Sequence, residues 1–216
     1  MKRLLSKEEI KNILMLIKDS ITYEIEPIFD AYCTDNVKKL VDGHNPCSLI
    51  VPRLLFPEIE GLGNLRYGNT YNTDNSEYAV KFMRDYFPRQ EYKKISGFIF
   101  NCWTRGLIRS HWSKGMSINN KNIGWQMSST CSQENHLIFT DVDKNIRTLS
   151  ISATYFYQDF LGAIDSYIKE FDSNDNNVND LIDKFSKVYY KINTAEPEKY
   201  TKRKPFLQDS DFDFFK

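Results

Sequence analysis

The residues best suited to chemistry are four basic side chains within ten positions of one another: Arg105, Arg109, His111 and Lys114. An arginine guanidinium offers a rigid fork of donors that matches phosphate oxygens, and it stays charged at any working pH. A histidine changes its protonation near neutral pH, so it can accept or donate a proton during a reaction. Together these residue types predict a phosphate-binding site with proton transfer at His111 and no need for a metal.

The segment that must position these side chains is strongly apolar at its start, where Phe98 to Trp103 reads FIFNCW. We therefore expect one buried helix from Phe98 to Lys114 that carries the basic residues toward its polar end. Charge on a core helix costs free energy unless it is paired or used. The candidate site is accordingly this basic group, in which Arg105, Arg109 and Lys114 can bind phosphate and His111 can transfer a proton.

Helix geometry separates Arg105 from His111. Six steps along an ideal helix put Arg105 and His111 about 120° apart, whereas Arg105 and Arg109 are only about 40° apart. One helix face therefore shows two arginines and not an arginine with a histidine. Joining Arg105 to His111 requires an irregular helix end or a second subunit.

A structural alternative explains the same residues without catalysis. In it, Arg105 and Arg109 pair with Glu58 and Glu60 of an earlier apolar segment, and His111 simply lies at a helix end. Buried ion pairs occur in protein cores without any catalytic role. Cations near a helix C-terminus also complement the helix dipole.

The remaining chemically interesting residues have simpler interpretations. Cys102 has cationic neighbours in sequence that would lower its pKa, but a packed core thiol is favoured on burial statistics. His136 precedes an apolar run and is expected at the surface, and His44 lies in a turn-like Gly-His-Asn-Pro segment. The cysteines and histidines lack metal-ligand spacing. We expect no metal and no cofactor.

Composition limits the classes of protein that the chain can belong to. Its 216 residues suit one domain, and 41% of them are apolar, which is enough for a packed core. Twenty-nine basic residues balance twenty-nine acidic ones, so no global charge attracts nucleic acid or a membrane. No run approaches the roughly 18 apolar residues of a spanning helix, and charges interrupt any signal-peptide core. The expectation is a cytoplasmic protein with no membrane contact.

The first half of the chain has helical patterning. A capping box at Ser6–Glu9 begins a helix that is expected to reach about Ile25 and to end or bend near Pro27. Further helical segments are expected over residues 28–41, from Pro46 to a stop at Gly68-Asn69, and over residues 77–86. The helix that carries the basic residues follows Pro88.

The second half mixes short β-favouring runs with two more helices. The runs cover residues 123–127, 136–141 and 146–151, with a hairpin turn at 141–145, and the helices lie at 155–168 and around 181–189. We expect a single mainly α domain over residues 1–194 with a small antiparallel β-hairpin insert at about 116–152. Residues 195–216 lose apolar periodicity, which is typical of a flexible tail.

Three motifs give the chain a family resemblance: LGNLRYG at Leu62–Gly68, RGLIRSH at Arg105–His111, and FYQDFLGAIDSYI at Phe156–Ile168. With them, residues 6 to 170 resemble the HEPN superfamily of helical proteins, in particular uncharacterised bacterial HEPN-like proteins. The resemblance implies a helical bundle and a homodimer formed through the Arg/His region. It also implies a metal-independent endoribonuclease with Arg105 and His111 as its catalytic pair, or a degenerate relative that binds RNA or a nucleotide without cutting it.

The chain departs from the family pattern next to the catalytic arginine. Active members place Asn, Asp or His after that arginine, whereas Gly106 follows Arg105 here. A second register aligns Gly106–Arg109 with the family's G-L-x-H. Arg109 then replaces the histidine and Thr104 the arginine, which removes the catalytic pair. Both registers remain open at this point.

The C-terminal segment suggests a different class of function. QDSDFDFF, Gln208–Phe215, alternates acidic and aromatic residues, as do short peptides that dock in a partner's groove. The competing hypothesis is therefore a non-enzymatic interaction module. Its arginines would be structural, and its tail would recruit a protein partner.

Overall fold

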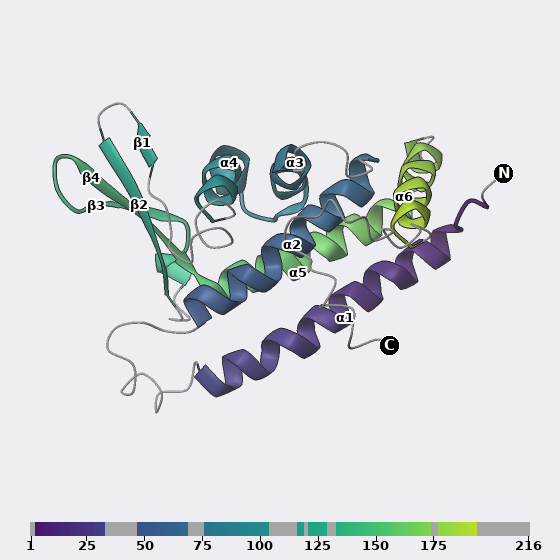
Figure 1. Cartoon of the computed structure of the whole chain (residues 1–216), viewed down its shortest axis with the longest axis horizontal. Helices are drawn as coiled ribbons and strands as arrows, with labels where there is room; N and C mark the ends of the chain where they lie inside the picture. Colours follow the sequence, from purple (N-terminus) through teal and green to yellow (C-terminus); the bar gives the residue numbers. More distant parts are fainter. Residues whose placement is uncertain are drawn as a thin grey trace, which may run out of the picture.

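The computed structural model describes residues 3–32, 47–68, 76–103, 116–118, 121–128, 133–173 and 177–193. These residues form six α-helices and one small four-stranded sheet (Figure 1). The prediction of a mainly helical protein with a small β region is confirmed. The predicted boundary and tail at residues 194–216 lie outside the described residues.

The first helix, α1 (Lys7–Tyr32), begins at the predicted capping box. The Ser6 amide donates to Glu9 Oε2 at 2.8 Å, and the Glu9 amide donates to Ser6 Oγ at 3.2 Å. The two side chains thereby provide hydrogen-bond acceptors for backbone amides that have no partner within the helix. The apolar face of α1 then packs into the core through residues that share a helical repeat: Ile10, Leu14, Ile21 and Ile25.

Of the two outcomes expected at Pro27, an end to the helix near Ile25 does not occur, because α1 continues through Pro27 to Tyr32. A proline inside a helix removes one backbone hydrogen bond. Burial on both sides of it compensates for that loss: Ile25 is fully buried, and the ring of Phe29 lies 5.6 Å from that of Tyr157. The separate helix expected from residue 28 thus begins inside α1, and residues 33–41 lie outside the described residues.

Helices α2 (Cys47–Tyr67) and α5 (Ala153–Glu170) cross the middle of the molecule (Figure 1). Helix α1 runs along one side of them, and α3 (Ser76–Tyr86) and α4 (Glu91–Trp103) lie on the other side. Helix α6 (Asn177–Asn193) is at one end and the sheet at the opposite end. Aromatic rings join these layers, since Phe56 of α2 contacts both Phe100 of α4 and Phe156 of α5.

The LGNLRYG motif, Leu62–Gly68, has a packing role at the end of α2. Gly63 faces the backbone of α3, where a Cβ atom would lie 2.6 Å from the carbonyl oxygen of Tyr78. Gly68 has φ +80° and its amide donates to the Asn64 carbonyl at 3.0 Å, which ends the helix as predicted. Both glycines are therefore explained by close approach and backbone conformation.

The sheet is larger than the predicted hairpin and is mixed. Its order is β1-β2-β4-β3, with β1 (Met116–Ile118), β2 (Lys121–Ser128), β3 (Ile138–Asp141) and β4 (Ile146–Ser152). Strands β3 and β4 are antiparallel across residues 142–145, whereas β2 and β4 are parallel. Strand β4 runs directly into α5, whose first turn is capped by Ser152 Oγ.

None of the helices in the described part of the chain combines the length and the apolar character needed to cross a membrane.

Candidate functional site

The four predicted site residues, Arg105, Arg109, His111 and Lys114, belong to residues 104–115, which lie outside the described residues. The structure does describe how the chain is held on either side of this basic segment. The described part of α4 runs to Trp103, and the described part of β1 begins at Met116 and pairs with β2. The last turns of α4 are firmly anchored, since their core side chains are at most 2% exposed: Ile99, Phe100 and Cys102.

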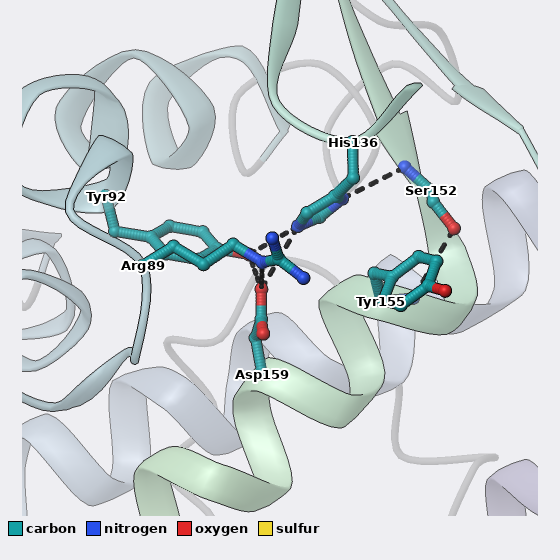
Figure 2. Close-up of polar contacts among 6 residues, drawn as sticks. All are labelled: Arg89, Tyr92, His136, Ser152, Tyr155 and Asp159. Carbon is teal, nitrogen blue, oxygen red and sulfur yellow. Dashed lines mark hydrogen bonds and ion pairs between the residues drawn. The ribbon is translucent and has the colours of Figure 1, made fainter. Parts of the chain in front are cut away.

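A buried polar cluster lies where α4, the sheet and α5 meet (Figure 2). Its centre is Asp159 of α5, whose side chain is 7% exposed. One oxygen, Oδ2, accepts from Arg89 Nε at 2.9 Å and from Tyr92 OH at 3.0 Å, and it lies 3.1 Å from His136 Nε2. We call these four residues the Asp159 cluster. They join three segments that are far apart in the sequence.

The hydrogen bonds of His136 fix its neutral tautomer. The Ser152 amide donates to His136 Nδ1 at 3.2 Å, so the ring proton is on Nε2, which faces Asp159 (Figure 2). Protonating Nδ1 would break the bond from Ser152. Both ring nitrogens are therefore engaged within the fold, which suits a structural histidine and not a general base.

The prediction that His136 lies at the surface is wrong, because its side chain is fully buried. The cause is tertiary: the histidine packs against the rings of Tyr92 and Tyr155, at 6.2 Å and 5.9 Å. Burial, together with the Asp159 carboxylate, also raises the pKa of Tyr92 well above its usual range. The phenol consequently stays protonated and donates to Asp159.

Arg89 connects the Asp159 cluster to an open pocket of about 600 Å³. Its guanidinium carbon lies 5.6 Å from the centre of the Tyr155 ring, and its contacts with other described residues leave the terminal nitrogens available. The pocket is also lined by Glu91, Glu134 and Leu137. Among its described lining residues the only arginine, Arg89, is already paired with Asp159, and Glu91 and Glu134 face the same space, so these residues do not favour a polyanion.

Leu137 adds backbone strain to this pocket. Its φ is 62°, in the left-handed region that a branched side chain seldom adopts, and the residue is 6% exposed. Such strain persists only where the surrounding structure holds it in place. Here the preceding His136 is held by Ser152 and Asp159, which accounts for the constraint.

Cys102 is a core thiol. The residue is 1% exposed, and burial raises the pKa of its thiol to about 11. The favoured packing interpretation is confirmed, and the lowered pKa that cationic neighbours suggested is wrong. Among the described residues no group of three or more His, Cys, Asp or Glu side chains is arranged to hold a metal ion.

The two glutamates expected to hold Arg105 and Arg109 lie on α2. Neither Glu58 nor Glu60 has an ion-pair partner within the described ranges. Burial raises the pKa of Glu58, and the nearby carboxylate of Glu24 on α1 raises it further. The described surroundings of Glu58 thus oppose its negative charge.

We predict that Glu58→Gln stabilises the protein at pH 7. The raised pKa means that ionised Glu58 destabilises the folded state as pH rises above the unfolded-state pKa, and the cost is complete above the folded-state pKa. The gain from glutamine should therefore disappear below about pH 4, where the carboxyl is protonated in both states. Thermal unfolding at pH 7 and pH 4 measures the difference.

The same measurement tests the structural alternative for the basic segment. If Glu58 holds Arg105 or Arg109, removing its charge strands an arginine, and Glu58→Gln lowers the melting temperature at pH 7. Glu60→Gln on the same helix is the comparison: the structural alternative pairs Glu60 with an arginine as well, so it expects both variants to lower the melting temperature.

The described fold defines a mainly helical protein with a mixed four-stranded sheet at one end and a buried polar cluster joining the two. Comparisons with protein-family models, curated proteins and solved structures found no match. The HEPN resemblance accordingly rests on the three sequence motifs.

Proposed function

We propose that this protein is HEPN-like and acts on RNA without a metal. Arg105, Arg109 and Lys114 bind backbone phosphate, and His111 transfers the proton. The observation that carries the proposal is the placement of this basic segment between two packed elements. Helix α4 is buried up to Cys102 and β1 is paired from Met116, so four basic residues are tethered at both ends.

The other polar candidates in the described part of the chain support this assignment indirectly, because each has a role in the fold. His136 uses both ring nitrogens within the Asp159 cluster, and Cys102 is a buried protonated thiol. The Arg89 pocket carries two glutamates. We therefore assign the external phosphate to the basic segment and not to these residues.

The proposed chemistry uses the RNA itself as the nucleophile. The ribose 2′-oxygen attacks the adjacent phosphorus, and the P–O5′ bond breaks to leave a 2′,3′-cyclic phosphate and a 5′-hydroxyl. His111 accepts the 2′-hydroxyl proton while water protonates the leaving oxygen, or it protonates the leaving oxygen while water takes the 2′-hydroxyl proton, and the arginines hold the charged phosphate. Because helix geometry separates Arg105 from His111, we propose that a second copy of the chain completes the pair in a homodimer.

We predict that a single-stranded RNA is cleaved in EDTA and that Arg105→Ala and His111→Ala each slow cleavage by about 100-fold or more. Lys94→Ala is the control, because Lys94 is an exposed cation on α4 outside the basic segment. Gel analysis of end-labelled RNA gives the rates and identifies the cyclic phosphate. Equal cleavage by wild type and both variants would mean a contaminating nuclease.

Binding is measured in parallel, since a degenerate relative would bind RNA without cutting it. Wild-type binding without cleavage, weakened by Arg105→Ala and by added salt, identifies that relative. The absence of both binding and cleavage in the wild type contradicts an RNA-directed function.

A second candidate, a protein-interaction module, is favoured by one observation on α1. Three large apolar side chains there are exposed: Met15 at 51%, Leu16 at 68% and Tyr23 at 83%. Apolar side chains gathered on one exposed helix are typical of a contact with another protein. This candidate becomes the better description if RNA is neither bound nor cut.

A further inference from the structure

A second pocket, of about 440 Å³, lies between the N-terminal segment and α6. Its lining combines apolar surface with positive charge, and the residues that matter are Arg3, Leu4, Lys187, Tyr190, Lys191 and Asp183. This pocket shares no described lining residue with the Arg89 pocket, and its function is independent of the RNA proposal.

The pocket is built by a tertiary contact. The amide of Leu5 donates to Ser186 Oγ at 3.0 Å, and the Leu5 side chain is buried. This contact holds the N-terminal segment on α6 and leaves the neighbouring Leu4 56% exposed at the pocket. An apolar surface is thus held in place before any ligand arrives.

The charges around this apolar surface favour an acidic occupant. Three cations, Arg3, Lys187 and Lys191, face one acid, Asp183. Arg3 is paired with Glu9, whereas Lys187 has no hydrogen bond or ion pair with any other described residue. The ligand that suits this pocket is a peptide with an apolar side chain flanked by carboxylates.

We propose that this pocket binds the acidic-aromatic segment of the same chain, Gln208–Phe215. The segment alternates aspartates with phenylalanines, so its rings would cover Leu4 and Tyr190 while its carboxylates meet Lys187. While it is docked, the segment prevents other acidic peptides from binding the pocket. The segment itself is then unable to bind other proteins.

Chain length permits docking within one molecule. Residues 194–207 connect the end of α6 to the acidic-aromatic segment, and fourteen extended residues span up to about 45 Å. Along the helix, Lys187 is only about 9 Å from Asn193, at 1.5 Å per residue. The connection therefore reaches the pocket without strain, and tethering raises the local concentration of the segment to about the millimolar range.

The test uses the full chain and a fluorescent peptide of residues 206–216, with a tail-silenced variant in which Phe212, Phe214 and Phe215 are alanine. The silenced variant should bind the peptide at least tenfold tighter than the wild type, because its own tail no longer competes. Adding Lys187→Glu to the silenced variant should abolish binding. Adding Lys169→Glu, an exposed charge reversal on α5, should leave binding unchanged.

Three results would overturn the proposal. One is binding that survives Lys187→Glu or is matched by a peptide with the same residues in scrambled order. Another is equal peptide affinity, or no measurable binding, for the wild type and the silenced variant. The third is a wild type that sediments as a dimer while the silenced variant is a monomer, because the tail would then occupy a second copy. Circular dichroism verifies that each variant is folded.

Discussion

Asp159→Ala should lower the free energy of unfolding by about 3–5 kcal/mol, which is typical when one partner of a buried ionic network is removed. The carboxylate oxygen Oδ2 serves Arg89, Tyr92 and His136, so its loss leaves three donors without their acceptor. The substitution also separates α5 from the segment before β3. Urea unfolding followed by circular dichroism measures the change.

Asp165→Ala is the matched control, since it makes the same substitution on the same helix. Asp165 pairs with Lys18 of α1 at 2.6 Å, but its side chain is 48% exposed. Pairs of this kind contribute about 1 kcal/mol or less. If Asp159→Ala lowers the free energy of unfolding no more than Asp165→Ala does, the Asp159 cluster is not an important source of stability.

Gly63→Ala should also destabilise the protein, by about 1–3 kcal/mol, through overpacking between α2 and α3. The added Cβ would lie 2.6 Å from the Tyr78 carbonyl oxygen and 3.0 Å from the Ala79 amide nitrogen. Both atoms belong to the backbone, so the clash cannot be relieved by turning a side chain. The two helices must move apart.

Gly61→Ala on the same helix should have the opposite sign. A Cβ at Gly61 meets nothing within 4 Å, and alanine is favoured over glycine in a helix by up to about 1 kcal/mol. The pair of variants separates packing from helix propensity, because only packing differs between the two positions. Thermal melts in which both variants shift in the same direction would contradict the close approach of α2 to α3.

The helices could largely be predicted from local pattern. The capping box at Ser6–Glu9 and the stop at Gly68 depend on neighbouring residues alone, and both were placed correctly. The end of α1 could not be predicted in this way. Tyr157, which packs on Phe29 beyond Pro27, is more than 120 residues away in the sequence.

The sheet could be predicted only in part, for a related reason. Runs rich in β-favouring residues located β2, β3 and β4. The parallel pairing of β2 with β4 depends on contacts between residues such as Trp125 and Leu149, which no local motif specifies. Strand β1, with three residues, is too short to have a pattern.

The sequence holds one signal for the Asp159 cluster. Asp159 lies on the helix face that Phe156, Phe160 and Ala163 bury, where an unpaired carboxylate would be costly. That placement predicts a partner for Asp159. It does not predict which partner, because Arg89 and His136 come from other elements.

The link between Ser152, His136 and Asp159 has a consequence for how the molecule comes apart. Fraying of the strands would expose the His136 imidazole and break its hydrogen bond with the Ser152 amide at the start of α5. The sheet therefore cannot open while α5 keeps its contact with His136 through Asp159. The two regions should therefore behave as one cooperative foldon.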